Sequence, residues 1–181
     1  MRLFHYTSLF HLPQILEDGY LKVTESNASM TRTHAAPDVV WLTTNPSPGN
    51  EESLDGCSFS KKQVRFEVDV PASRYRQWAK NNNVSPKLVQ RLNYTGGGQA
   101  NNWYVIERPV TKEEWSRIDI FVAEIQQWVN FYNKYESEEL QALKANELAP
   151  IVARWKEERK QIMDTCVIVD GNQHVEKQKA S

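Results

Sequence analysis

The feature that most constrains the fold is a strict alternation of apolar and charged residues between positions 63 and 70. Four apolar residues occupy every second position: Val64, Phe66, Val68 and Val70. The positions between them are charged: Arg65, Glu67 and Asp69. Successive side chains of a strand point to opposite faces. The pattern therefore predicts a strand with one face in a core and the other in solvent or lining a cleft.

Further strands are predicted where β-branched and aromatic residues cluster, at 2–6, 39–43, 103–107 and 167–169, with a short extended piece at 20–23. Helical spacing predicts helices at 9–16, stopped by Gly19, and at 71–83 and 85–92, the last capped by Ser85. A capping box at 111–114 predicts a short helix, while 117–121 fits either a strand or a helix. Residues 24–38 are expected to form a loop.

The pattern changes after residue 122. Apolar residues recur there at helical spacing: Ile125, Trp128, Val129, Tyr132, then Ile151, Trp155 and Ile162. We expect an α+β domain at 1–122, followed at 123–181 by a helical hairpin built around Trp128, Tyr132 and Trp155, with a polar tail.

Composition excludes several classes of function. The chain has 181 residues, with 22 Lys and Arg against 23 Asp and Glu, so no strong overall field draws it to nucleic acid or an anionic membrane. No apolar run suits a membrane span or a signal peptide, and the two cysteines are far apart. The four histidines show no zinc-site spacing. A cytoplasmic protein without a metal site is expected.

The most informative triplet is His5-Tyr6-Thr7, because it places donors and acceptors where a strand gives way to a helix. Three later strands offer partners for a ligand site: Thr43, Arg65 and Glu107. A locally satisfied histidine remains the alternative for His5. Arg65 is equally compatible with a surface bridge to Glu67.

Three segments together resemble the ADP-ribosyltransferase-like fold: 4–9, 15–21 and 40–43. They are similar to a His-Tyr-Thr strand, a leucine-rich helix followed by Gly and Leu, and a Trp-Leu-Thr strand. The likeness is nearest to bacterial and phage members, among them the toxins that modify thymidine in single-stranded DNA, and covers residues 2–120. It implies a split, strongly bent mixed sheet around a cleft for NAD.

The resemblance also implies roles for individual residues. His5 would hold the NAD ribose, and Tyr6 and Thr7 the nicotinamide amide. Aromatic walls are expected from Tyr20, Trp41 or Tyr104, with Thr43 beside them, and the pyrophosphate would pair with Arg32 or Arg65. Glu107 is the best match for the catalytic acid, which stabilises the positive charge that develops on the ribose.

The acid assignment has an alternative, because the family's acidic pair separated by one residue is absent around Glu107. Glu67-Val68-Asp69 has that spacing. Glu67 would then be the acid, and Glu107 a structural partner of Arg108 or Arg117.

The expected function is transfer of ADP-ribose from NAD to a nucleic acid or protein, in a toxin or a phage–host conflict factor, with an antitoxin or inhibitor as a partner. The stretch 74–80 combines Arg, Lys, Tyr and Trp, which suits single-stranded nucleic acid. Its alternative is an amphipathic helix with Tyr75 and Trp78 in the core. The alternative function is a catalytically silent binding module for a protein or nucleic acid.

Overall fold

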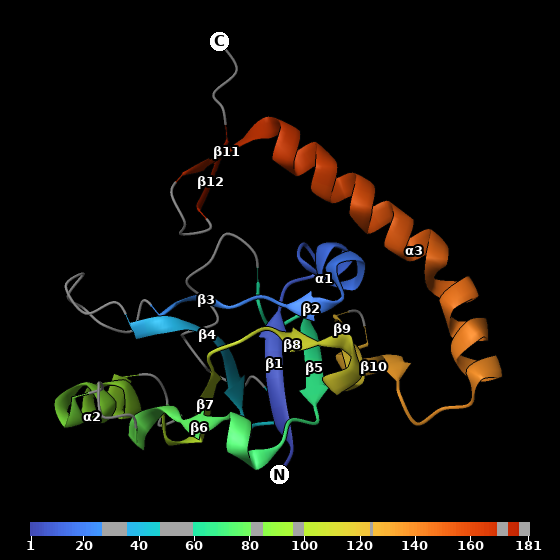
Figure 1. Cartoon of the computed structure of the whole chain (residues 1–181). Helices are drawn as coiled ribbons and strands as arrows, with labels where there is room; N and C mark the ends of the chain where they lie inside the picture. Colours follow the sequence, from blue (N-terminus) through green and yellow to red (C-terminus); the bar gives the residue numbers. More distant parts are fainter. Residues whose placement is uncertain are drawn as a thin grey trace.

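The computed structural model describes residues 1–26, 36–47, 60–80, 85–95, 100–123, 125–169 and 174–177. Within these ranges the chain forms one large β-sheet crossed by a long C-terminal helix (Figure 1). Arg32, the triple glycine at 96–98 and the turn at 81–83 lie outside the described residues.

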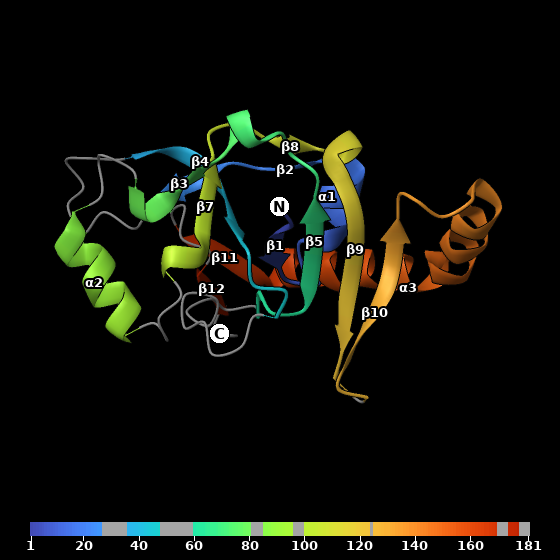
Figure 2. The same ribbon diagram turned by 90° about the horizontal axis from the view of Figure 1, so that it is seen from below.

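The large sheet is antiparallel at every described pairing, with the strand order β10-β9-β5-β1-β4-β7-β6 (Figure 2). In chain order its strands are β1 (Leu3–Thr7), β3 (Thr24–Ser26), β4 (Ala36–Thr43), β5 (Val64–Val68), β6 (Arg76–Gln77), β7 (Trp103–Ile106), β9 (Trp115–Val122) and β10 (Gln127–Asn133). β3 pairs with β4 beside this path. The α+β class is therefore confirmed. The mixed sheet is wrong for the described residues, because no helical crossover joins two neighbouring parallel strands.

Two small antiparallel sheets stand apart from the large one. One joins β2 (Tyr20–Leu21) to β8 (Val110–Thr111), and the other joins β11 (Cys166–Val169) to β12 (His174–Lys177). The strands predicted at 20–23 and 167–169 are thereby confirmed.

The alternating strand behaves as its pattern predicts. Val64, Phe66 and Val68 are at most 2% exposed and define the core face of the sheet. They pack with apolar residues of β1, β4 and β9, and α1 (Leu12–Asp18) and α3 (Glu138–Thr165) add apolar side chains to the same cluster. Arg65 and Glu67 point to the other side, called here the opposite face.

Helix α1 ends as expected at Gly19, whose φ of 74° is left-handed and whose N–H donates to the carbonyl of Ile15. Glycine adopts this conformation without steric cost, so it is the favoured residue just beyond a helix. The capping box at Thr111 and Glu114 is also present, around a short 3-10 helix at Lys112–Glu114.

The helix predicted at 71–83 is wrong for its described part. Short 3-10 helices at Ala72–Arg74 and Trp78–Lys80 flank β6 instead. Trp78 packs between Trp41 and Trp103, at ring distances of 5.9 and 5.4 Å, and Tyr75 packs against Tyr104. The three tryptophans belong to a second core on the opposite face, which α2 (Pro86–Thr95) helps to cover, whereas Tyr75 and Tyr104 pack against the first cluster.

The predicted C-terminal helical hairpin is also wrong. Its first half is strand β10, which pairs with β9 along the edge of the large sheet, and α3 is a single helix of 28 residues. The spacing of Ile125, Trp128, Val129 and Tyr132 fits a helix, but Ile125 precedes β10 and is exposed, as is Val129, and a β-bulge between Asn130 and Tyr132 shifts the register of the strand. Strand β10 thus lies in the same sheet as the 1–122 segment.

Candidate functional site

The sheet divides between β1 and β4. These strands share a single registered pair, Phe4 with Thr43, although both continue past it. By contrast, β1 pairs with β5 along its whole length, and β4 pairs with β7 from Val40 to Thr43. Backbone groups of β1 and β4 beyond Phe4 therefore face a gap in the pairing, and His5 is the first residue there.

His5 bridges this division with its side chain. Its Nδ1 lies 2.9 Å from the carbonyl oxygen of Trp41. A carbonyl only accepts hydrogen bonds, so Nδ1 carries the proton and Nε2 is an acceptor in the neutral ring. Among the residues that the structure describes, no hydrogen bond reaches Nε2. The half-buried ring thus presents a fixed acceptor beside the division.

Burial keeps this imidazole neutral. Desolvation lowers the pKa of His5 to about 4, against a smaller opposing effect of the Trp41 carbonyl. The positive charges of Lys61 and His11 lower that pKa further. At neutral pH His5 is therefore an acceptor and not a cation.

The two residues after His5 differ in direction. Thr7 is buried and shares the core face with His5, because it pairs with Val64. Tyr6 points to the opposite face, where its hydroxyl donates to the carbonyl of Asn45 at 2.9 Å. The side chains of the predicted triplet are consequently divided between the two faces of the sheet.

The remaining aromatic and hydroxyl candidates are engaged in packing and turns. The Trp41 ring belongs to the second core, and the Thr43 hydroxyl accepts a hydrogen bond from the Asn45 backbone at 3.1 Å. Tyr20 is half-buried in β2, opposite Thr111. The structure does not gather these side chains around His5.

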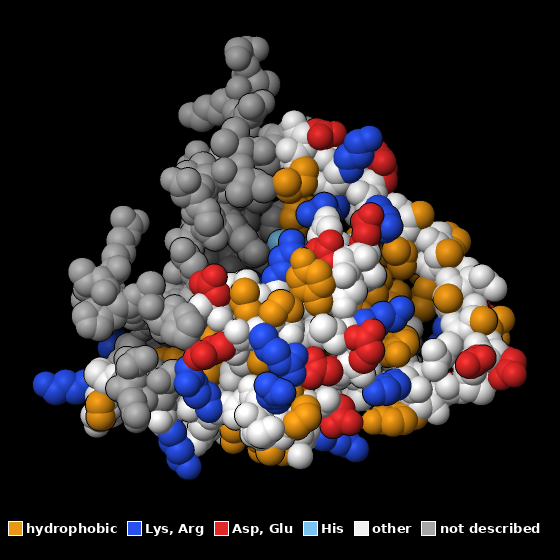
Figure 3. All heavy atoms as spheres, in the orientation of Figure 1, with side chains coloured by type: hydrophobic (Ala, Val, Ile, Leu, Met, Phe, Trp, Pro, Cys, Tyr) orange, Lys and Arg blue, Asp and Glu red, His pale blue; other side chains and the backbone are white. Residues whose placement is uncertain are grey.

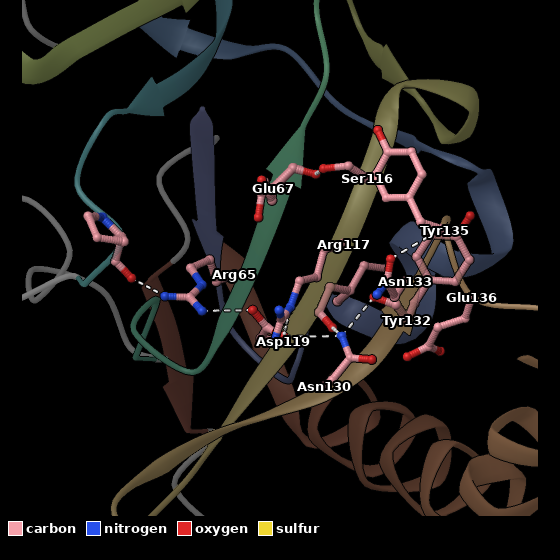
Figure 4. Close-up of polar contacts among 12 residues, drawn as sticks. Arg65, Glu67, Ser116, Arg117, Asp119, Asn130, Tyr132, Asn133, Tyr135 and Glu136 are labelled. Atoms are coloured by element: carbon pink, nitrogen blue, oxygen red, sulfur yellow. Dashed lines mark hydrogen bonds and ion pairs between the residues drawn. The ribbon is translucent and has the colours of Figure 1, made fainter. Parts of the chain in front are cut away.

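Arg65 belongs to a polar network on the opposite face (Figure 4). Its guanidinium donates to Asp119 Oδ2 at 2.7 Å and to the carbonyl of Pro46. It also lies 4.6 Å from the ring centre of Trp128 and 5.4 Å from that of Phe4. Such stacking suits the planar guanidinium.

Asp119 is the centre of this network and is 1% exposed. It accepts hydrogen bonds from Arg65, from Arg117 Nε at 2.6 Å and from Asn130 Nδ2 at 3.3 Å. Sequence reasoning missed it, although its charge between Ile118 and Ile120 continues the alternation of β5 onto β9. The predicted bridge from Arg65 to Glu67 is replaced by this pair.

The two candidate acids have separate partners. Glu107, directly after β7, is exposed and forms an ion pair with Arg76. Its predicted alternative partners pair elsewhere, Arg108 with Glu114 and Arg117 with Asp119. Glu67 lies on the opposite face, 3.4 Å from Arg2.

Glu107 follows a strand that runs in the same direction as β1. β1 and β7 both run antiparallel to β4, so their carboxyl ends lie at the same edge of the sheet. Glu107 therefore follows β7 at the edge where Thr7 ends β1. Within the described ranges, no hydrogen bond or ion pair joins either carboxylate to His5.

A cavity of about 380 Å³ lies between α3 and β10, visible as a hollow beside the helix in Figure 3. Its walls are mainly apolar, with Phe131 and Leu148 among them. At its rim Lys144 donates to Glu136 and to Asn130. Nothing in the sequence pattern indicated it, because β10 was predicted as a helix.

Charges of both signs are interspersed over the described surface in Figure 3. The described residues contain no group of three or more His, Cys, Asp or Glu side chains placed to hold a metal ion. No described helix is long and apolar enough to cross a membrane. Searches with protein-family models, among curated proteins and among solved structures each found no match.

Proposed function

We propose that this protein transfers ADP-ribose from NAD to a macromolecular acceptor, a nucleic acid or a protein, and that His5 is its primary NAD contact. The observation that carries the proposal is the division of the sheet at His5. There a neutral imidazole is held by the Trp41 carbonyl, with Nε2 available as an acceptor. This supports the role that the sequence resemblance implies for the first-strand histidine.

The neutral ring suits a ribose. A hydroxyl of the ribose donates to Nε2 of His5, and this hydrogen bond fixes the position of the ribose. Because the imidazole is neutral, no cation is placed beside the pyridinium of NAD. In the reaction the bond from the ribosyl carbon to nicotinamide breaks and its electron pair leaves with nicotinamide. The acceptor then bonds to that carbon and gives up its proton to solvent.

Glu107 is the proposed acid, since it lies at the carboxyl-end edge that β1 and β7 share. Its carboxylate would stabilise the positive charge on the ribosyl carbon. It is paired with Arg76, so it acts only after that exposed ion pair opens. Exposed ion pairs contribute little stability, so opening this one costs little.

Release of nicotinamide from NAD by the full chain tests the proposal. The wild type is expected to release it, while Glu107→Gln lowers the rate by about 100-fold or more. Glu113→Gln is the matched control, because Glu113 is a fully exposed carboxylate. If Glu67→Gln abolishes release and Glu107→Gln does not, the acid is Glu67. Absence of release from the wild type with every acceptor class contradicts the proposal.

The second candidate, a catalytically silent binding module, has its own observation in the Glu107–Arg76 ion pair. A carboxylate held by arginine is less available to an oxocarbenium-like centre. This candidate predicts binding of a protein or nucleic acid without nicotinamide release. Tyr75 and Trp78 do not support nucleic-acid binding by this candidate, because their rings pack against Tyr104 and Trp103 within the protein.

A further inference from the structure

The cavity between α3 and β10 is separate from the proposed NAD site. Strand β10 is an edge strand of the large sheet, and β9 and β5 lie between it and β1, which carries His5. The cavity volume of about 380 Å³ falls within the range of pockets that hold small molecules, roughly 300–1,000 Å³. The cavity is therefore a candidate for a second binding site with an occupant of its own.

One continuous face of α3 forms a long wall of this cavity (Figure 3). The helix residues that line it begin at Gln141, end at Lys156 and recur at intervals of three and four. Residues at these intervals share one side of a helix. At a rise of 1.5 Å per residue, this wall is about 22 Å long. Such a wall suits a linear occupant better than a round one.

Small apolar side chains leave space along the middle of this wall. They are three alanines at successive turns of α3: Ala145, Ala149 and Ala153. Before them, Lys144 donates to Asn130 of β10 at 2.7 Å. After them, the Trp155 ring lies 6.5 Å from the ring of Phe131, also in β10. Wall atoms without neighbours lose dispersion contacts, so an apolar occupant is favoured between these two attachments.

The charges at the Lys144 end of the cavity neutralise each other. The Lys144 ammonium donates to both carboxylate oxygens of Glu136, at 2.5 and 2.6 Å, in addition to Asn130. A lysine ammonium has three N–H donors, so all of them are engaged. This end of the cavity therefore has no donor or net charge to offer a ligand.

Lys156 gives the other end of the cavity a positive charge. Its side chain is 52% exposed, and its Nζ lies 3.9 Å from Oε2 of Glu17, a carboxylate that is 65% exposed. This distance is longer than a hydrogen bond, and exposed ion pairs of this kind are weak. An anionic group at the Lys156 end could therefore replace Glu17 at little cost.

We propose that the cavity between α3 and β10 binds a linear amphipathic carboxylate. Its aliphatic chain lies along the three alanines, and its carboxylate binds the Lys156 ammonium in place of Glu17. The apolar walls select the chain, and the charge of Lys156 selects a negative head group at one end only. This site does not depend on the proposed NAD chemistry.

Decanoate is the probe, titrated by calorimetry into the full chain below the concentration at which decanoate forms micelles. Lys156→Gln is expected to weaken its binding about tenfold, through loss of a charge-assisted hydrogen bond. Glu17→Gln is expected to strengthen binding, because it removes the competing carboxylate. Lys160→Gln is the matched control, since Lys160 is an exposed lysine of α3 outside the cavity wall, and it should leave binding unchanged.

Two further measurements test the two parts of the ligand separately. Decanol has the same chain without the charge, so we expect it to bind about tenfold more weakly than decanoate and equally to the wild type and Lys156→Gln. Ala149→Phe fills the middle of the cavity and is expected to abolish binding of both compounds.

The proposal is overturned if the wild type does not bind decanoate, or if a folded Ala149→Phe variant binds it with wild-type affinity. Equal decanoate affinity of the wild type and Lys156→Gln also contradicts it, because the head group would then lie elsewhere. Thermal unfolding shows whether each variant is folded. If Ala149→Phe is not, Lys156→Gln and Glu17→Gln, both at exposed positions, decide the test by their opposite effects.

Discussion

At the scale of single residues, two side chains of the large sheet have contrasting surroundings, His5 on β1 and Asp119 on β9. His5 is kept neutral by burial, while Asp119 accepts hydrogen bonds from Arg65, Arg117 and Asn130. The alternation at 63–70 correctly predicted which side chains of β5 point into the core and which point to the opposite face. It did not predict that Arg65 would form an ion pair with Asp119, because the pairing of β5 with β9 depends on contacts between segments distant in sequence.

The burial of His5 predicts a specific pH dependence of stability. The pKa of His5 is about 4 in the folded chain and 6.5 when unfolded. Below the unfolded pKa the unfolded chain binds a proton that the folded chain does not, so the free energy of unfolding falls as pH drops from 6.5 toward 4. The loss from this group approaches about 3 kcal/mol.

Urea unfolding of the wild type and His5→Gln at about pH 7 and about pH 4.5 isolates this effect from the carboxylates. The wild type should lose more stability than the variant over that interval. Equal losses would show that His5 titrates normally in the folded chain.

Asp119 should be the most costly acid to neutralise. Asp119→Asn leaves Arg65 partly buried without its counter-charge, so we expect the free energy of unfolding to fall by about 3–5 kcal/mol. Glu67→Gln is the comparison, because its partner Arg2 is exposed, and a loss below about 1 kcal/mol is expected. Denaturant unfolding measures both. A similarly small loss in both variants would refute the central role of Asp119.

At the scale of elements, prediction succeeded where the period was unambiguous. β5 has a clean period of two, and α1 has a glycine stop, so both were found. The prediction of a helix where β10 forms was wrong, because the aromatic and apolar residues at 125–132 fit both a helical period and a strand period. Pairing with the free edge of β9 decides in favour of the strand. The helix predicted at 71–83 was wrong because packing of Trp78 into the second core outweighs the local helical pattern.

Pro150 gives a prediction for α3, since it stands inside the helix at an exposed position. Proline removes a backbone donor and crowds the preceding turn. Pro150→Ala should therefore raise the free energy of unfolding by roughly 1–3 kcal/mol and increase helical circular dichroism. Ala153→Pro should have the opposite effect. A less stable Pro150→Ala protein would mean that the proline is needed to seat α3 against α1 and the sheet.

At the scale of the whole molecule, the sequence indicated the α+β class and the importance of the first strand. It did not reveal that β10 extends the large sheet, or that the candidate residues fall on two faces. Tyr6, Thr43 and Arg65 are engaged on the opposite face, whereas His5 stands at the division between β1 and β4. Side-chain direction follows from strand register, which emerges only when distant segments pair.

The most direct test of the proposed NAD site is nitrogen-15 NMR of the His5 imidazole during an NAD titration, assigned with His5→Gln. At neutral pH we expect a neutral ring protonated on Nδ1, with a resonance of unprotonated Nε2 that shifts as NAD is added. A protonated ring, or an Nε2 resonance that stays unchanged at saturating NAD or at the highest attainable concentration, would contradict the account.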